Sequence, residues 1–112
     1  MANHDFMQNQ INYVDSVISM YLNLPDTPIK PSFNDRFIAS TFFAQNIPIN
    51  TIQAALLLAS LRRCCRQDDL PPLAPVRSLA YFIPVVDELA AVPLPDDYIL
   101  YLRAKLLSFS SP

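Results

Sequence analysis

The chain has 112 residues, a formal net charge of −2, eleven prolines and no glycine. The absence of glycine excludes phosphate-cradling loops, nucleophile elbows and dinucleotide-binding turns, because each of these needs backbone without a Cβ atom. The small negative charge argues against broad nucleic-acid binding through the overall field and leaves only a local basic patch for that role.

Length and proline spacing predict one all-α domain over residues 1–112, with residues 1–4 and 109–112 frayed. Chains of this size bury roughly two-thirds of their unfolded surface, which is enough for a core without metals or disulfides. Apolar residues recur every three to four positions between the prolines, so we expect a compact bundle of about five short helices with proline-rich connectors. Because hydrophobic residues make up 52% of the chain and charged residues 16%, we expect apolar surface outside the core and a protein partner that covers it.

The cysteines and the hydropathy pattern bear on the compartment. Cys64 and Cys65 are adjacent and diverge by about 100° on a helix, so they cannot easily bridge each other and a reducing compartment is the simpler interpretation. The sequence shows neither a signal-peptide pattern nor an apolar run of about 18 residues. We therefore expect a cytoplasmic protein that binds no membrane.

Two amphipathic helices are predicted in the first part of the chain. The first covers about residues 5–22, and its apolar stripe consists of Phe6, Ile11, Val14, Ile18, Tyr21 and Leu22. After an extended connector with three prolines, Ser32 and Asp35 form a capping-box pattern that opens a second helix over about residues 33–45. The core-facing stripe of that helix is expected to contain Phe33, Phe37, Ile38, Thr41 and Phe42.

The third helix decides the predicted architecture. Residues 46–49 break the chain, and Asn50 with Gln53 gives a cap-like start for a helix that runs to about Arg66. Because residues 54–61 are apolar nearly all round, we expect this helix to be the buried centre of the bundle. The alternative is a helix-turn-helix in which this helix reads DNA bases; ordinary αα-hairpin packing is favoured.

A proline-rich connector over residues 67–75 follows the third helix. Leu70 and Leu73 are expected to be buried and to clasp the connector onto the bundle. The other interpretation is a polyproline II ligand for an aromatic groove.

Two further helices are predicted after this connector. One covers about residues 76–91, is kinked or restarted at Pro84, and turns inward Leu79, Phe82, Ile83, Val86 and Leu89. The last opens with Pro95 at its first position and runs to about Ser108, with two aspartates beside its positive end.

Candidate binding residues fall into two sets. Nucleic-acid backbone or an acidic partner is predicted to bind the only concentrated basic patch, which consists of Arg62, Arg63, Arg66 and Arg77. The alternative for the arginines at the end of the third helix is that they complement its dipole and pair with Asp68 and Asp69. A partner-binding surface is predicted at Tyr81, Tyr98 and Tyr101.

No catalytic residue, metal site or cofactor is predicted. His4 is the only histidine and lies near the N-terminus, so a nucleophile–base pair would need a very particular fold-back. The cysteines and acidic residues lack the spacing of metal-ligand motifs. We therefore expect a non-enzymatic protein.

The segment from Tyr21 to Leu89 resembles the DnaD-like domain of bacterial replication-initiation proteins. The resemblance rests on a tyrosine followed by a proline-marked connector, a helical pair around residues 46–50, the apolar helix over residues 54–61 and a late aromatic helix. In that family the late helix carries a tyrosine, an isoleucine and a tryptophan at intervals of four, associated with DNA binding. The matching positions here are Tyr81, Val85 and Leu89.

Residues 77–82 are also typical of uncharacterised proteins on bacterial mobile elements. The resemblance implies an accessory factor in DNA replication or mobile-element maintenance that docks on a protein partner and contacts nucleic-acid backbone through the four arginines. The alternative is a protein-binding adaptor, an inhibitor or a small subunit of a larger assembly, with no nucleic-acid contact. A homodimer is a third prediction, because self-association hides surplus apolar surface.

Overall fold

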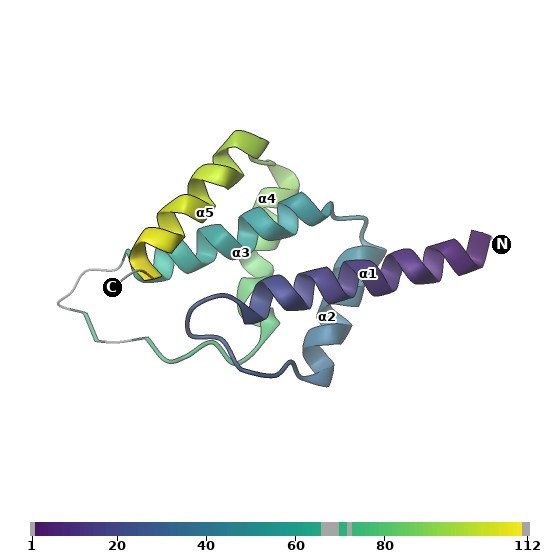
Figure 1. Ribbon diagram of the computed structural model, residues 1–112, viewed down its shortest axis with the longest axis horizontal. Coiled ribbons are helices and arrows are strands. Elements are labelled where there is room, and N and C mark those ends of the chain that lie inside the picture. Colours follow the sequence, from purple (N-terminus) through teal and green to yellow (C-terminus); the bar gives the residue numbers. More distant parts are fainter. Residues whose placement is uncertain (1, 66–69, 72, 111–112) are drawn as a thin grey trace.

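Helices carry the architecture of the part of the chain that the computed structural model describes, which is residues 2–65, 70–71 and 73–110. The elements in order are α1 (Ala2–Leu22), α2 (Phe33–Ala44), α3 (Ile49–Cys64), the 3-10 turn η1 (Leu79–Phe82), α4 (Ile83–Ala91) and α5 (Asp96–Ser110) (Figure 1). The described residues contain no strand. The prediction of an all-α bundle of about five helices is therefore confirmed.

The helix α3 is the centre of the bundle. It packs against α1, α4 and α5, while α2 packs against α1 and η1. Figure 1 shows α1 and α5 on opposite sides of α3, with α3 and α5 running in the same direction. Most side chains of α3 are buried, namely Thr51, Ile52, Ala54, Ala55, Leu56, Leu57, Ala59, Ser60 and Leu61. The predicted burial of this helix is confirmed.

The start of α2 depends on a buried acid. Ser32 and Asp35 form the predicted capping box: Ser32 Oγ accepts from Asp35 N at 3.1 Å, and Asp35 Oδ2 accepts from Ser32 N at 2.9 Å. The second oxygen, Asp35 Oδ1, accepts from Leu79 N at 2.9 Å. One carboxylate therefore caps α2 and holds η1 against it, across 44 residues of sequence.

The end of α2 shows how a chain without glycine makes a left-handed turn. Asn46 has φ of 59°, and its N–H donates to Phe43 O at 3.0 Å. The next N–H, from Ile47, donates to Phe42 O at 3.2 Å. These two bonds form a Schellman motif, in which asparagine takes the position that usually holds glycine.

The helix α3 starts earlier than the sequence predicts. Its N-cap is Pro48, with no side-chain cap, and the N–H groups of Thr51 and Ile52 donate to Pro48 O at 3.0 and 3.2 Å. Asn50 therefore lies inside the first turn, and the predicted cap by Asn50 and Gln53 is wrong. Proline fits this boundary because its locked φ angle suits the entry to a helix and its own N–H is not needed there. The helix ends at Cys64, before the predicted Arg66.

The predicted apolar stripes of α1 and α2 are only partly buried. Ile18 and Tyr21 on α1 lie in the core, as do Ile38 and Phe42 on α2. By contrast, the large apolar side chains that remain exposed on these two helices include Phe6, Ile11, Phe33 and Phe37. The expectation that these four side chains face the core is wrong. The first half of α1 extends past the start of α3, and so lacks the neighbour that covers its second half. One side of α2 likewise has no neighbouring helix among the described residues.

The late connector is anchored differently from the prediction. Leu70 and Leu73 are exposed, so the predicted leucine clasp is wrong. Val76 is buried instead, and its N–H donates to Asp26 O at 2.8 Å. This bond ties the late connector to the one after α1, so the two proline-rich segments lie side by side.

Two helices replace the single one predicted over residues 76–91. The 3-10 turn η1 comes first, and α4 restarts with Pro84 in its first turn, where the missing N–H has no intrahelical partner to lose. The restart at Pro84 is therefore confirmed. The last helix begins one residue after Pro95, whose carbonyl accepts from Tyr98 N and Ile99 N at 3.0 and 3.3 Å.

Candidate functional site

Two of the arginines predicted to bind nucleic acid, Arg62 and Arg63, contact acidic side chains of the same chain. Arg62 points to α4, where its two terminal nitrogens reach the two carboxylate oxygens of Glu88 at 3.0 and 3.2 Å. This paired geometry raises the pKa of Arg62 and lowers the pKa of Glu88, in each case mainly through the side-chain hydrogen bond. Arg62 is thus already occupied by a carboxylate of the same chain.

The side chain of Arg63 links the end of α3 to the connector after α1 and to the connector before η1. Its Nη2 donates to Ala74 O at 3.0 Å and lies 3.5 Å from Asp26 Oδ2. The guanidinium carbon lies 5.2 Å from the centre of the Tyr81 ring, within the range of a cation–π contact. Only 9% of the Arg63 side chain is exposed, so this arginine is placed to hold connectors rather than to meet a ligand.

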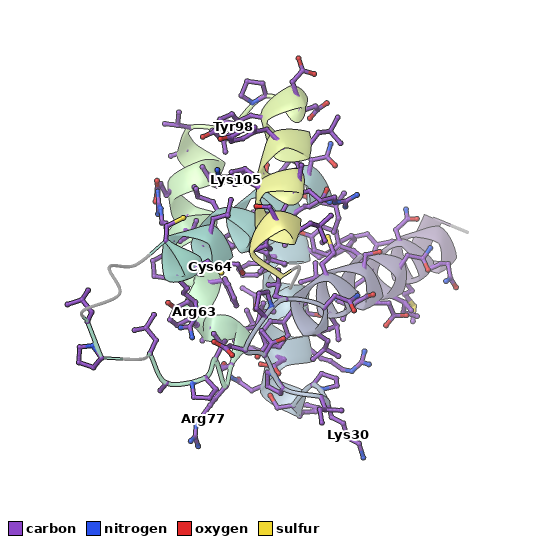
Figure 2. All side chains as sticks on the ribbon, turned by 60° about the vertical axis from the view of Figure 1, so that its left-hand side comes forward. Lys30, Arg63, Cys64, Arg77, Tyr98 and Lys105 are labelled. Atoms are coloured by element: carbon purple, nitrogen blue, oxygen red, sulfur yellow. The ribbon has the colours of Figure 1, made fainter. Side chains whose placement is uncertain are left out.

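The predicted patch has two further members, Arg66 and Arg77. Arg66, Asp68 and Asp69 lie outside the described residues, so the predicted pairing of arginines with these aspartates falls there too. Arg77 is exposed and has no ion-pair partner in the described part of the chain. Figure 2 shows Arg77 and Lys30 extending outward from the two connectors, away from the helical core.

The predicted tyrosine surface also divides in two. Tyr98 and Tyr101 form one pair on α5, with ring centres 5.6 Å apart, and both are exposed. Tyr81 lies on η1 against Arg63. The DnaD-like positions likewise share no exposed face, because Tyr81 is on η1 while Val85 is half-buried and Leu89 is buried on α4.

A buried polar pair lies under η1. Tyr21 is fully buried, its ring packs edge-on against Phe82 at 5.9 Å, and its hydroxyl has no hydrogen-bond partner in the described structure. Burial raises the pKa of Tyr21 to about 12, and the charge of Asp35 adds to the shift. Because both side chains are closed off from solvent, the pair serves packing and capping rather than chemistry on a substrate.

A groove runs along the seam between α3 and α5. It consists of two neighbouring clefts of about 240 and 260 Å³. Gln53 and Arg103 line both clefts, so the two meet at these residues. The first cleft is otherwise lined by Asn50, Asp96, Ile99 and Leu100. The second is mostly aliphatic and is otherwise lined by Met20, Asn23, Leu24, Leu56, Leu57, Leu106 and Leu107.

The wall that α5 contributes has a regular spacing. Asp96, Leu100, Arg103 and Leu107 follow one another at intervals of four, three and four residues, which places them on one stripe of the helix. Leu100 and Leu107 are both more than half exposed, and Arg103 has no ion-pair partner among the described residues. The sequence analysis missed this stripe, although its spacing was visible in the sequence.

The described residues contain neither a metal-binding cluster nor a membrane-spanning helix. Among them, no group of three or more His, Cys, Asp and Glu side chains comes together in a way that could bind a metal ion. Burial raises the pKa of the Cys64 thiol, which reduces its thiolate fraction. No helix in the described part of the chain combines the length and the apolar character needed to cross a bilayer.

Comparison with protein-family models, with curated proteins and with solved structures gives no match for this chain. The resemblance to the DnaD-like domain therefore stays a prediction. The α3–α5 groove combines apolar lining with Arg103, which lines both of its clefts and has no ion-pair partner among the described residues.

Proposed function

We propose that this chain is a non-enzymatic protein-binding module that takes an amphipathic helix of another protein into the α3–α5 groove. The observation that carries the proposal is the pair of clefts that meet at Arg103, with exposed leucines on both sides of it. Apolar clefts with a few well-placed polar groups are the usual form of a binding site.

The shape of the groove favours a helix as its occupant. The stripe from Asp96 to Leu107 covers twelve residues, and the eleven steps between its ends correspond to about 16 Å along α5, or about three helical turns. Its four-three-four spacing is that of a seam between two packed helices. A bound helix with apolar residues at matching intervals would cover Leu100 and Leu107, as in other helix-in-groove complexes.

Charge complementarity specifies the partner further. Arg103 lies at the centre of the groove without an ion-pair partner in the described chain, and Asp96 lies at one end. The partner helix is therefore expected to carry an acidic residue opposite Arg103, between two apolar anchors. The anchors supply affinity through burial of apolar surface, and the charge selects the partner and its register.

Site-specific crosslinking in the native host tests this proposal. A photoreactive residue at position 100 or 107 should crosslink to one protein, at a helix with an acidic residue within its apolar face. The same residue at position 29, on the connector after α1, is the matched exposed control. Crosslinking from position 29 alone, or to many proteins equally, contradicts the proposal.

A charge variant with its own control sharpens that experiment. Arg103→Glu should abolish capture of the crosslinked protein, because it places a like charge opposite the partner's acid. Lys30→Glu makes the same change of charge outside the groove and should leave capture intact. Equal loss in both variants would mean that only net charge matters.

Nucleic-acid contact is a second candidate function, within the role in DNA replication or mobile-element maintenance that the DnaD-like resemblance implies. It is favoured by Arg77 and Lys30, two cations that extend from neighbouring connectors and have no ion-pair partner in the described residues. If it operates, duplex DNA should bind with an affinity that falls as salt rises, and Arg77→Ala with Lys30→Ala should reduce the salt slope by about two. No binding at low salt eliminates this candidate.

A further inference from the structure

The first half of α1 has an apolar face that the rest of the described chain leaves uncovered. Met7 and Ile11 are 60% and 51% exposed. They belong to an apolar stripe with four-three-four spacing that continues through Val14 to Ile18. The side chains of this stripe become more buried along the helix: Val14 is half-buried, and Ile18 is only 4% exposed. We propose that a second copy of this chain covers this face, so that two copies pair through the first halves of their α1 helices.

The position of α3 explains why the face is free. Tyr13 Oη donates to Ile47 O at 2.7 Å, just before α3 begins, so α3 lies beside only the later part of α1. The earlier part contacts α2 through Phe6, whose ring centre is 5.3 Å from that of Phe43, and through Gln10, which donates to Ser40. Met7 and Ile11 follow these two α1 residues directly and lie about 100° further round the helix.

The charge pattern of the segment favours a second copy as the occupant. Residues 6–14 carry no charged side chain. In a two-fold interface both copies contribute the same surface, so a face with charges of one sign would place like charges together, whereas a neutral face does not. Beside the stripe, Gln8 Nε2 donates to Asn12 Oδ1 at 3.0 Å. Amide groups both donate and accept, and so can form a rim that is complementary to itself.

The spacing also suggests one arrangement of the two helices. If they are antiparallel with the two-fold axis near Asn9, Met7 of each copy lies opposite Ile11 of the other. Each apolar side chain then packs against an apolar one. Because only a few large side chains take part, we expect a weak dimer whose population depends on concentration. The surface is separate from the α3–α5 groove, so this inference does not depend on the proposed function.

Sedimentation equilibrium from about 1 μM to about 1 mM tests the proposal, since an interface of this size is expected to dissociate in that range. The unaltered chain should form a monomer–dimer equilibrium. Met7→Lys and Ile11→Glu should each raise the dissociation constant at least about tenfold. Ile29→Glu changes a side chain that is 94% exposed elsewhere and should have no such effect.

A mixture of the two variants tests the antiparallel arrangement. In a mixed dimer the introduced lysine faces the introduced glutamate, while the unaltered Ile11 of one copy still faces the unaltered Met7 of the other. Equal amounts of Met7→Lys and Ile11→Glu should therefore dimerise when neither does so alone. Circular dichroism at each step shows whether the helices persist, and Ile11→Gln repeats the test without a charge. A monomer throughout the range, an equal loss in Ile29→Glu, or a mixture that stays monomeric would overturn the proposal.

Discussion

The two halves of α1 share one apolar stripe but lie in opposite environments. In the second half, Val17, Ile18 and Tyr21 are buried in the core, whereas in the first half Phe6, Met7 and Ile11 are each more than half exposed. The apolar stripe continues through both halves, and what changes is the neighbour: α3 accompanies only the second half. A periodic stripe therefore shows which side of a helix can be buried, but not how far along the helix the core extends.

Substitution of one isoleucine in each half of α1 tests this comparison, and the largest change in the free energy of unfolding is expected for the buried one. Ile18→Ala removes a core side chain and should lower the free energy of unfolding by about 2–4 kcal/mol. Ile11→Ala makes the same chemical change on the exposed half and should alter it by no more than about 0.5 kcal/mol. Urea denaturation at low protein concentration, where self-association is suppressed, measures both values. Similar losses would mean that the first half of α1 is packed in solution.

The buried carboxylate of Asp35 is expected to have an effect of similar size. Asp35→Ala removes the acceptor for Ser32 N and for the buried Leu79 N, and should cost about 2–4 kcal/mol. Ser32→Ala removes one cap bond but leaves the bond from Asp35 to η1 in place. It should therefore cost only about 1 kcal/mol.

Comparison of these two variants by denaturation isolates the bond between α2 and η1. Equal costs for Asp35→Ala and Ser32→Ala would mean that Asp35 acts only as a cap. A larger cost for Asp35→Ala supports the view that this side chain ties two distant segments together.

Local chemistry made part of this fold predictable from the sequence. The capping box needs only Ser32 and Asp35 at a spacing of three, and the burial of α3 follows from apolar residues on all its sides. Both features are decided within one helix. The start of α3 was misplaced because Asn50 and Gln53 fit the cap pattern, while the true boundary depends on Pro48 and its carbonyl.

The candidate site was less predictable because it depends on distances between helices. The sequence places Arg62 and Arg63 side by side, yet one pairs with Glu88 on α4 and the other with Asp26 before α2. Neither partner could be chosen from spacing alone. The groove at Arg103 was missed for the same reason: the stripe on α5 is visible in the sequence, but the opposite wall comes from α3 and the end of α1.

The two tyrosines of α1 should make the stability of the fold sensitive to alkaline pH. Burial raises the pKa of both Tyr13 and Tyr21 to about 12, whereas an unfolded tyrosine ionises near pH 10. Since the folded state holds these protons longer, stability is unaffected below about pH 9 and decreases as pH rises from about 10 towards 12. Tyrosinate absorbance recorded with circular dichroism measures this, and the last tyrosines should ionise as the helices are lost. Ionisation of every tyrosine near pH 10 in an intact fold contradicts the burial of these two.

The smallest effect on stability is expected for removal of the Arg62–Glu88 ion pair. The same pair determines whether Arg62 is free to bind an anion. Both side chains are about half exposed, and exposed ion pairs contribute little to stability. Because the folded-state pKa of Glu88 is lowered by Arg62, what the pair contributes is present above the ordinary carboxyl range and is lost as pH falls through the lowered pKa. At pH 7 this contribution is present but small, because the pair is exposed, so Glu88→Gln should leave the denaturation midpoint nearly unchanged.

The same substitution should have a clearer effect on binding to a polyanion. Glu88→Gln releases Arg62 from its carboxylate, so affinity for heparin at low salt should rise more than the change in net charge alone explains. Asp87→Asn is the matched control, because it makes the same change of charge on the neighbouring exposed residue without touching Arg62. A larger gain in heparin affinity for Glu88→Gln means that Arg62 can bind an anion once Glu88 no longer pairs with it. Equal gains mean that Arg62 is only a tie between α3 and α4, and the protein-binding groove then remains the better account of this molecule.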